Sequence, residues 1–210
     1  MAYSVVGIVN MALQRIGAKS SITALTDGTP NAIKANTVWE YIRDEVLEAV
    51  KPKFATVRVA LAQSATLPAN AEVYDFAYPL PVDYLCLADD SKDDPNVWPD
   101  TSVKPYVIET LADGTVCVMT NYDSVTEDYD IFLTYVRKVV DPAKYYPSFI
   151  NALAFRLAAE LALTITESGS KYEAMTNLYI KALKKAKAAS RAQDYIEDEK
   201  GSDSYETAGR

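Results

Sequence analysis

The chain has 210 residues, of which 49% are hydrophobic, and it carries a net charge of −8 with few glycines and prolines. This length and apolar content suffice for one sizeable globular domain or two small ones, and they exclude a disordered protein. Arg156 and Glu160 interrupt the longest apolar run, and the first ten residues lack a basic segment. We therefore expect neither a transmembrane nor a secreted product.

The chain contains no histidine and only two cysteines, Cys86 and Cys117. The absence of histidine removes Ser-His and Cys-His dyads and every histidine-based zinc site. Both cysteines lie in apolar, strand-like runs, which favours buried free thiols and synthesis in a reducing cytosol. An enzyme would have to work with carboxylates, lysine or tyrosine alone.

Acidic residues are concentrated in the middle of the chain. Residues 72–130 contain fourteen aspartates and glutamates but only two lysines, whereas the segments before and after are slightly basic. This asymmetry does not define a fold, but it indicates faces that meet differently charged partners.

Two amphipathic helices are predicted at the start of the chain. Apolar residues recur at helical spacing over residues 5–16, with Ser4 placed to cap the first turn and a glycine directly after the last. The second helix should span residues 30–50, because Thr29 can cap it, a first-turn proline follows, and Pro52 stops it.

After Pro52 the apolar pattern changes from helical spacing to alternation, which predicts short strands. We expect them at residues 54–61, 84–87, 105–108, 115–119 and 129–139. Asp113-Gly114 lies between two β-branched runs and indicates a hairpin. Residues 68–83 are rich in proline and are predicted as a loop that leads through residues 78–81 into the strand at 84–87.

Residues 147–191 predict two helices joined at residues 168–170. The first is apolar on almost every face, and such a helix must be buried in a bundle or an oligomer. The second has one apolar stripe and one basic face. The stripe comprises Tyr172, Met175, Leu178, Tyr179, Ala182, Leu183 and Ala186, and the basic face comprises Lys181, Lys184, Lys185, Lys187 and Arg191.

Helices on both sides of a central β segment predict an α+β fold, namely a helical bundle of about four helices with an inserted antiparallel β region and a flexible C-terminal tail. The expected segments are the N-terminal helices at 1–52, the acidic β-rich insertion at 53–141, the C-terminal helices at 142–194 and an extended tail at 195–210. The tail is too polar to order alone, so it should order only against a partner, with Tyr205 as its anchor.

Candidate catalytic and metal-binding patterns are weak. The aspartates of the loop 89–100 could hold calcium or magnesium, but the loop lacks the glycine and glutamate of an EF-hand, which favours a solvated loop or an oligomer contact. Arg156 and Glu160 lie four residues apart, which favours an ion pair over a catalytic carboxylate. We expect no catalytic residue, cofactor or metal, and a carboxylate-dependent enzyme with a metal at residues 89–94 is an alternative.

The candidate interface combines the basic face with Tyr205 of the tail. Its residues are Lys181, Lys184, Lys185, Lys187, Arg191 and Tyr205. Clustered cations could bind nucleic acid through counterion release. However, no aromatic residue other than Tyr179 is interleaved with these cations in the sequence of the helix, and the chain is acidic overall. A solvated face, or a face that meets acidic protein such as the chain's own tail or β region, is therefore favoured over a nucleic-acid-binding module.

Four segments, in their order and spacing, resemble the tail tubular protein A family, the head-to-tail adaptors of T7-like short-tailed bacteriophages. They are ALQRIGAKSSITALTDGT, YIRDEVLEAVKPKFATVRVALA, FAYPLPVDYLCL and LTYVRKVVDPAKYYPSFINALAFRLAAELALTIT, and together they span most of residues 5–190. The chain departs from the family pattern where a tryptophan is expected after Pro52, and its loop 89–100 matches no segment of that pattern.

The resemblance implies a structural virion protein of the tail neck, made in the host cytoplasm and without enzymatic activity. Its implied partners are its own copies in a twelve-fold ring, the portal protein, the tail nozzle protein and double-stranded DNA that passes through the channel without sequence-specific binding. No membrane is implied. The helical bundle would pack side by side around the ring, and the β region and tail would reach neighbouring proteins.

Overall fold

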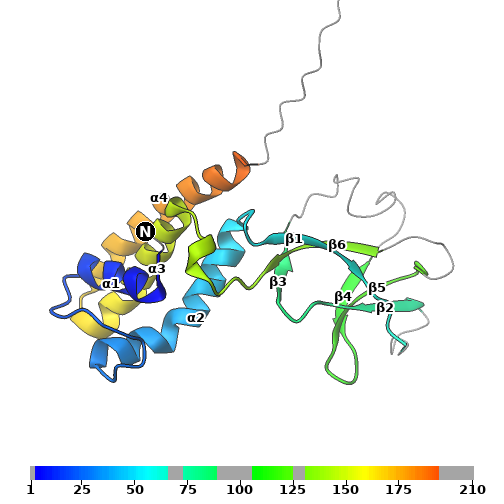
Figure 1. The fold of residues 1–210 in the computed structure, drawn as a ribbon, viewed down its shortest axis with the longest axis horizontal. Helices are drawn as coiled ribbons and strands as arrows, with labels where there is room; N and C mark the ends of the chain where they lie inside the picture. Colours follow the sequence, from blue (N-terminus) through cyan, green and yellow to red (C-terminus); the bar gives the residue numbers. More distant parts are fainter. Residues whose placement is uncertain (1–2, 66–72, 89–105, 125–130, 194–210) are drawn as a thin grey trace, which may run out of the picture.

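The computed structural model describes residues 3–65, 73–88, 106–124 and 131–193. They form two bodies side by side, a bundle of four α-helices and a region of two small antiparallel sheets (Figure 1). The β region is inserted between the second and third helices of the bundle. The predicted α+β fold of about four helices is therefore confirmed.

The helices are α1 (Val5–Arg15), α2 (Pro30–Val50), α3 (Pro147–Thr166) and α4 (Gly169–Arg191), with a 3-10 turn, η1, at Pro142–Lys144. Side-chain oxygens cap three of them, and the caps at Ser4 and Thr29 are those that the sequence predicts. Ser4, Thr29 and Ser168 accept hydrogen bonds from the first-turn amides of α1, α2 and α4. These bonds satisfy amides that have no partner inside the helix.

Helix α3 is the centre of the bundle and packs against α1, α2 and α4. Ten of its side chains are buried, and Leu153 and Leu157 are fully enclosed. Its length and apolar composition alone would allow it to cross a membrane, but more than half of its most apolar stretch is buried inside the bundle. Burial on several faces explains why the sequence of α3 has almost no polar side.

The predicted apolar stripe of α4 is confirmed over most of its length and is wrong at two positions. Ala182 and Ala186 are buried, and Met175, Tyr179 and Leu183 pack against the core. Tyr172 and Leu178 are each 37% exposed. Leu163, near the end of α3, is also exposed. The helical pair therefore extends beyond the core and leaves apolar side chains uncovered near its turn.

The β region consists of two three-stranded sheets (Figure 1). One has the order β1-β6-β3 and the other β2-β5-β4, and all pairs are antiparallel. The strands are β1 (Thr56–Leu61), β2 (Phe76–Pro79), β3 (Tyr84–Leu87), β4 (Val107–Thr110), β5 (Val116–Thr120) and β6 (Ile131–Arg137). The predicted hairpin is confirmed, because β4 and β5 pair across a turn in which Gly114 has φ 86°.

Strand β2 lies where the sequence predicts a loop. It is an edge strand that pairs only with β5 in its sheet, and Pro79 is its last residue, opposite Cys117. A proline is tolerated at such an edge because the missing amide leaves no ladder partner unsatisfied. The loop prediction is therefore wrong for residues 76–79, which form β2.

The two bodies meet at a cluster of aromatic side chains. Phe54, predicted as part of a strand, precedes β1 and packs on Tyr145, Tyr146 and Phe149 with ring centroids 5.1–5.4 Å apart. The Tyr145 hydroxyl donates a hydrogen bond to the carbonyl of Val139. The chain thus enters and leaves the β region at one aromatic joint.

Candidate interface at the end of helix α4

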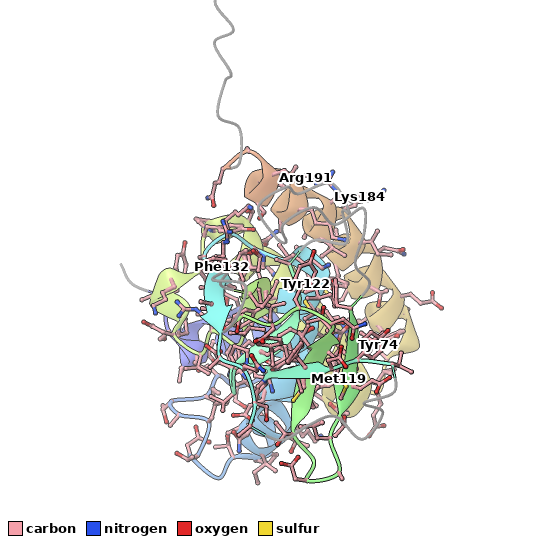
Figure 2. All side chains as sticks on the ribbon, turned by 90° about the vertical axis from the view of Figure 1, so that its right-hand side faces the viewer. Tyr74, Met119, Tyr122, Phe132, Lys184 and Arg191 are labelled. Atoms are coloured by element: carbon pink, nitrogen blue, oxygen red, sulfur yellow. The ribbon has the colours of Figure 1, made fainter. Side chains whose placement is uncertain are left out.

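All five predicted cations lie in α4, and all five are exposed. Figure 2 shows Lys184 and Arg191 near the C-terminal end of this helix, away from Tyr74 and Met119 in the β region. Tyr205, the sixth candidate residue, lies outside the described residues. Positive charge near the C-terminus of a helix is favoured by the helix dipole, so this placement stabilises α4 as well as forming a surface.

The structure divides the five cations into two groups. Lys184, Lys187 and Arg191 follow one another at spacings of three and four and line a shallow depression together with Ala188 and Ala192. Lys181 and Lys185 are absent from the residues that line this depression. The predicted basic face is therefore not one continuous site.

Lys187 and Arg191 also line a deeper cleft of about 810 Å³ between the end of α4, the end of α2 and strand β3. Two further cations, Lys51 and Lys53, line the same cleft. Among the described residues of its lining, Glu48 contributes the single carboxylate. The described part of the cleft lining therefore carries a net positive charge.

The end of α2 brings Lys51 and Lys53 to this place. Lys51 takes a left-handed conformation with φ 49°, which ends the helix, and the proline after it cannot continue one. The buried Ser190 of α4 then holds the turn. Its hydroxyl accepts a hydrogen bond from the amide of Lys53 at 3.2 Å and donates one to the carbonyl of Lys51 at 3.3 Å.

A second contact holds the other side of α4. The Tyr146 hydroxyl donates a hydrogen bond to the carbonyl of Ala186 at 3.0 Å, and burial raises the pKa of this phenol. Through Ser190 and Tyr146, the last turns of α4 are fixed to the α2–β1 junction and to the start of α3. The cleft is therefore a built feature of the bundle.

The opposite wall of the cleft comes from β3 and the residue after it. Tyr84, Cys86, Leu87 and Ala88 line it with largely neutral side chains, and burial raises the pKa of Tyr84. Cys86 is half-buried, whereas Cys117 is fully buried as predicted. The expectation of two buried thiols is thus confirmed for Cys117 and corrected for Cys86, because β3 borders an open cleft.

The chemistry of the cleft is that of an anion-binding surface. Four flexible or forked cations can pair with carboxylates or phosphates, and neutral walls beside them exclude part of the solvent. Within the described part of the chain, no group of three acidic, cysteine or histidine side chains could hold a metal ion. The aspartates at 89, 90, 93 and 94 lie outside the described residues.

Sequence reasoning did not identify Lys51 and Lys53. The sequence feature that could have identified them is the Lys-Pro-Lys pattern at the end of a predicted helix, because it places two cations where the chain must turn. Their approach to α4 depends on Ser190, which is 137 residues from Lys53 and has no local pattern that reveals the contact.

A partly buried cluster of ion pairs lies on the neighbouring side of α3. The predicted pairing of Arg156 with Glu160 is confirmed at 3.0 Å, and Arg156 also donates to Glu45 of α2 at 2.8 Å. Burial opposes the charge of Arg156, but these hydrogen bonds outweigh that effect and raise its pKa. The cluster joins α2 to α3, and it accounts for the two charges in the most apolar helix.

Comparison with known proteins assigns no family to this arrangement: no protein-family model matches the chain, and neither does any curated protein.

Proposed function

We propose that the protein is a structural component of a phage virion, the head-to-tail adaptor that forms a ring between the portal and the tail nozzle. The observation that carries this proposal is the insertion of the β region into a bundle built from both ends of the chain (Figure 1). This is the arrangement that the resemblance to the tail tubular protein A family implies. In this role the protein is not an enzyme and needs neither a cofactor nor a membrane.

The uncovered apolar side chains at one end of the bundle support assembly with other copies. Ile33 at the start of α2, Leu163 near the end of α3, and Tyr172 and Leu178 in α4 are all exposed. Lys34 donates a hydrogen bond to the carbonyl of Thr164, which joins the start of α2 to the end of α3. Apolar side chains that meet a different face of the next copy can close a ring.

The partners follow from the position of the ring. The portal protein lies on one side, the tail nozzle protein lies on the other, and double-stranded DNA passes through the centre without sequence-specific contacts. The tail of residues 192–210 docks on the portal, with Tyr205 as its anchor. Deletion of this tail should weaken attachment to portal-bearing heads, and unchanged attachment would contradict the docking.

Native mass spectrometry and particle imaging of the purified protein, alone and with portal, test the adaptor role directly. We expect closed rings of twelve copies, either in isolation or on the portal. A protein that remains monomeric and does not bind portal under both conditions would refute the proposal.

A second candidate function is a nucleic-acid-binding module. The observation that favours it is the row of Lys184, Lys187 and Arg191 along one side of α4, because such a row can follow a phosphate backbone. This function requires an affinity for free DNA that falls steeply with salt. A gel-shift titration without binding at low salt removes it.

A further inference from the structure

We propose that the cleft lined by Lys51, Lys53, Lys187 and Arg191 binds the acidic segment 194–199 of the same chain. The segment reads Asp-Tyr-Ile-Glu-Asp-Glu and begins three residues after Arg191. Its docking fixes the point from which the rest of the tail leaves the bundle. The inference does not require the adaptor function, because every group involved belongs to one chain.

Charge complementarity is the first argument. The described residues of the cleft lining include four cations and one carboxylate, and the segment holds four carboxylates and no cation. A net charge of about −4 on the segment therefore meets a net charge of about +3 in the cleft. Lys181 and Lys185, on the same helix, lie outside the cleft lining and should contribute much less.

Chain connectivity is the second argument. The described chain ends at Gln193, two residues beyond Arg191, which itself lines the cleft. Ser190 lies within 3.2 Å of the Lys53 amide, and a chain spans at most about 3.5 Å per residue, so residue 194 starts within roughly 14 Å of the Ser190 backbone. Six residues extend about 20 Å, which is enough to cross the cleft without a neighbouring copy.

The walls of the cleft supply the third argument. Tyr84, Leu87 and Ala88 offer neutral and apolar surface opposite the cations. Tyr195 and Ile196 lie between the acidic residues of the segment and can bury apolar surface there. A DNA backbone has phosphates but no comparable apolar groups, so the mixed lining favours the peptide over nucleic acid.

Tethering favours the chain's own segment over a free ligand. A segment joined to the rim of its site by a short linker has an effective concentration of about a millimolar or more. Residues 200–210, including Tyr205, would then extend up to roughly 40 Å from the cleft and remain available for a partner.

A labelled peptide with the sequence of residues 194–199 tests this inference by fluorescence anisotropy on the full-length protein. The key variant is D194N/E197Q/D198N/E199Q, which removes the charges of the tail and frees the cleft. We expect this variant to bind the peptide about tenfold more tightly than the unmodified chain, in which the tethered segment competes. Raising the salt concentration to about 0.5 M should weaken the binding, because exposed ion pairs are screened.

Two charge reversals on α4 locate the site in this tail-neutralised protein. K187E/R191E changes two residues of the cleft, and K181E/K185E makes the same change in charge outside it. We expect the first to reduce peptide affinity by about tenfold or more and the second by less than about twofold. Circular dichroism and thermal unfolding should show that both variants keep the fold.

Four results would overturn the inference. The first is peptide binding that is equally strong in the unmodified and tail-neutralised chains, and the second is an equal loss of peptide affinity in the two charge-reversal variants. The third is displacement of the peptide by short duplex DNA at a lower concentration than by unlabelled peptide. The fourth is an oligomer that dissociates when the tail is neutralised. The last result would assign the cleft to the tail of a second copy. These measurements use the isolated protein, so they can succeed or fail independently of ring assembly on a portal.

Discussion

Replacement of Phe54 by alanine should loosen the joint between the helical bundle and the β region. Phe54 is half-buried and contacts three aromatic rings, those of Tyr145, Tyr146 and Phe149, at centroid distances of 5.3, 5.4 and 5.1 Å. Two of these contacts are edge-on, the geometry in which aromatic rings attract one another. The alanine variant loses all three contacts at once.

The size of the effect follows from burial and ring contacts. Truncation of a fully buried phenylalanine costs about 3–5 kcal/mol, and the partial exposure of Phe54 reduces this to roughly 2–3 kcal/mol. For a chain of this length, each kcal/mol lowers the melting temperature by about 2–4 °C. F54A should therefore melt roughly 4–12 °C below the unmodified protein.

Phe132 provides a matched control. It is also half-buried, but it lies in β6 and contacts the guanidinium of Arg58 at 4.4 Å, and within the described part of the chain it makes no ring contact. A cation–π contact contributes about 0.5–1 kcal/mol at such a site, so F132A should cost about half as much as F54A. Relative to the unmodified protein, amide hydrogen exchange should be faster at the joint in F54A. In F132A it should be faster near β6 alone. Equal melting temperatures, or exchange unchanged at the joint, would refute the reasoning.

Three further substitutions test the core and two titrating groups. L157A removes a fully buried side chain at the bundle centre and should lower the free energy of unfolding in urea by about 2–5 kcal/mol, and a loss below about 1 kcal/mol would contradict its central role. Asp27 accepts hydrogen bonds from Thr29 and Thr23, and these bonds lower the pKa of its carboxyl. The ionised carboxylate therefore stabilises the folded protein fully above about pH 4, and this stabilisation is lost as the pH falls through the lower pKa of the folded state. D27N should therefore lower the melting temperature at pH 7 and have less effect in acid, and equal melting temperatures at pH 7 would exclude this role. Burial raises the pKa of Tyr145 to about 12. The neutral phenol therefore stabilises the folded protein below about pH 10, and this stabilisation is lost as the pH rises to 12. Y145F should make unfolding less dependent on pH in this range, and identical pH profiles would show that this phenol does not contribute.

The helical part of the fold is predictable because its signals are local. A helix start needs an oxygen within three residues of the first free amides, and Ser4, Thr29 and Ser168 provide it. The hairpin at Gly114 is equally local, since the turn alone requires a positive φ. These elements are determined by residues a few positions apart in the chain.

The differences arise where a distant segment decides the structure. Residues 76–79 read as a loop until β5 is placed beside them, and the exposure of Tyr172 and Leu178 in α4 depends on how far the neighbouring helices extend. Phe54 continues an alternating pattern, but it lies before the start of β1. Its ring packs on Tyr145, directly after η1, and on Phe149 of α3. A periodic pattern reports which side chains are apolar and leaves their partners undetermined.

The same distinction applies to the candidate interface. The cations of α4 are predictable because one helix carries them, but their separation into residues inside and outside a cleft is not. That separation depends on Ser190, whose hydroxyl joins the end of α4 to the Lys51–Lys53 turn. A serine in an alanine-rich and lysine-rich helix gives no local sign of a contact across more than a hundred residues.

The position of the cleft follows from the insertion of the β region. Because this region is inserted between α2 and α3, the chain must leave the bundle and return to it at neighbouring points, and the rings of Phe54 and Tyr145 meet there. Helix α4 runs back along α3 to the same place, where Ser190 attaches it. The joint, the cations of the cleft and the end of α4 are therefore held by one set of contacts. A partner that reorients the β region would also change the wall of the cleft, because β3 forms that wall.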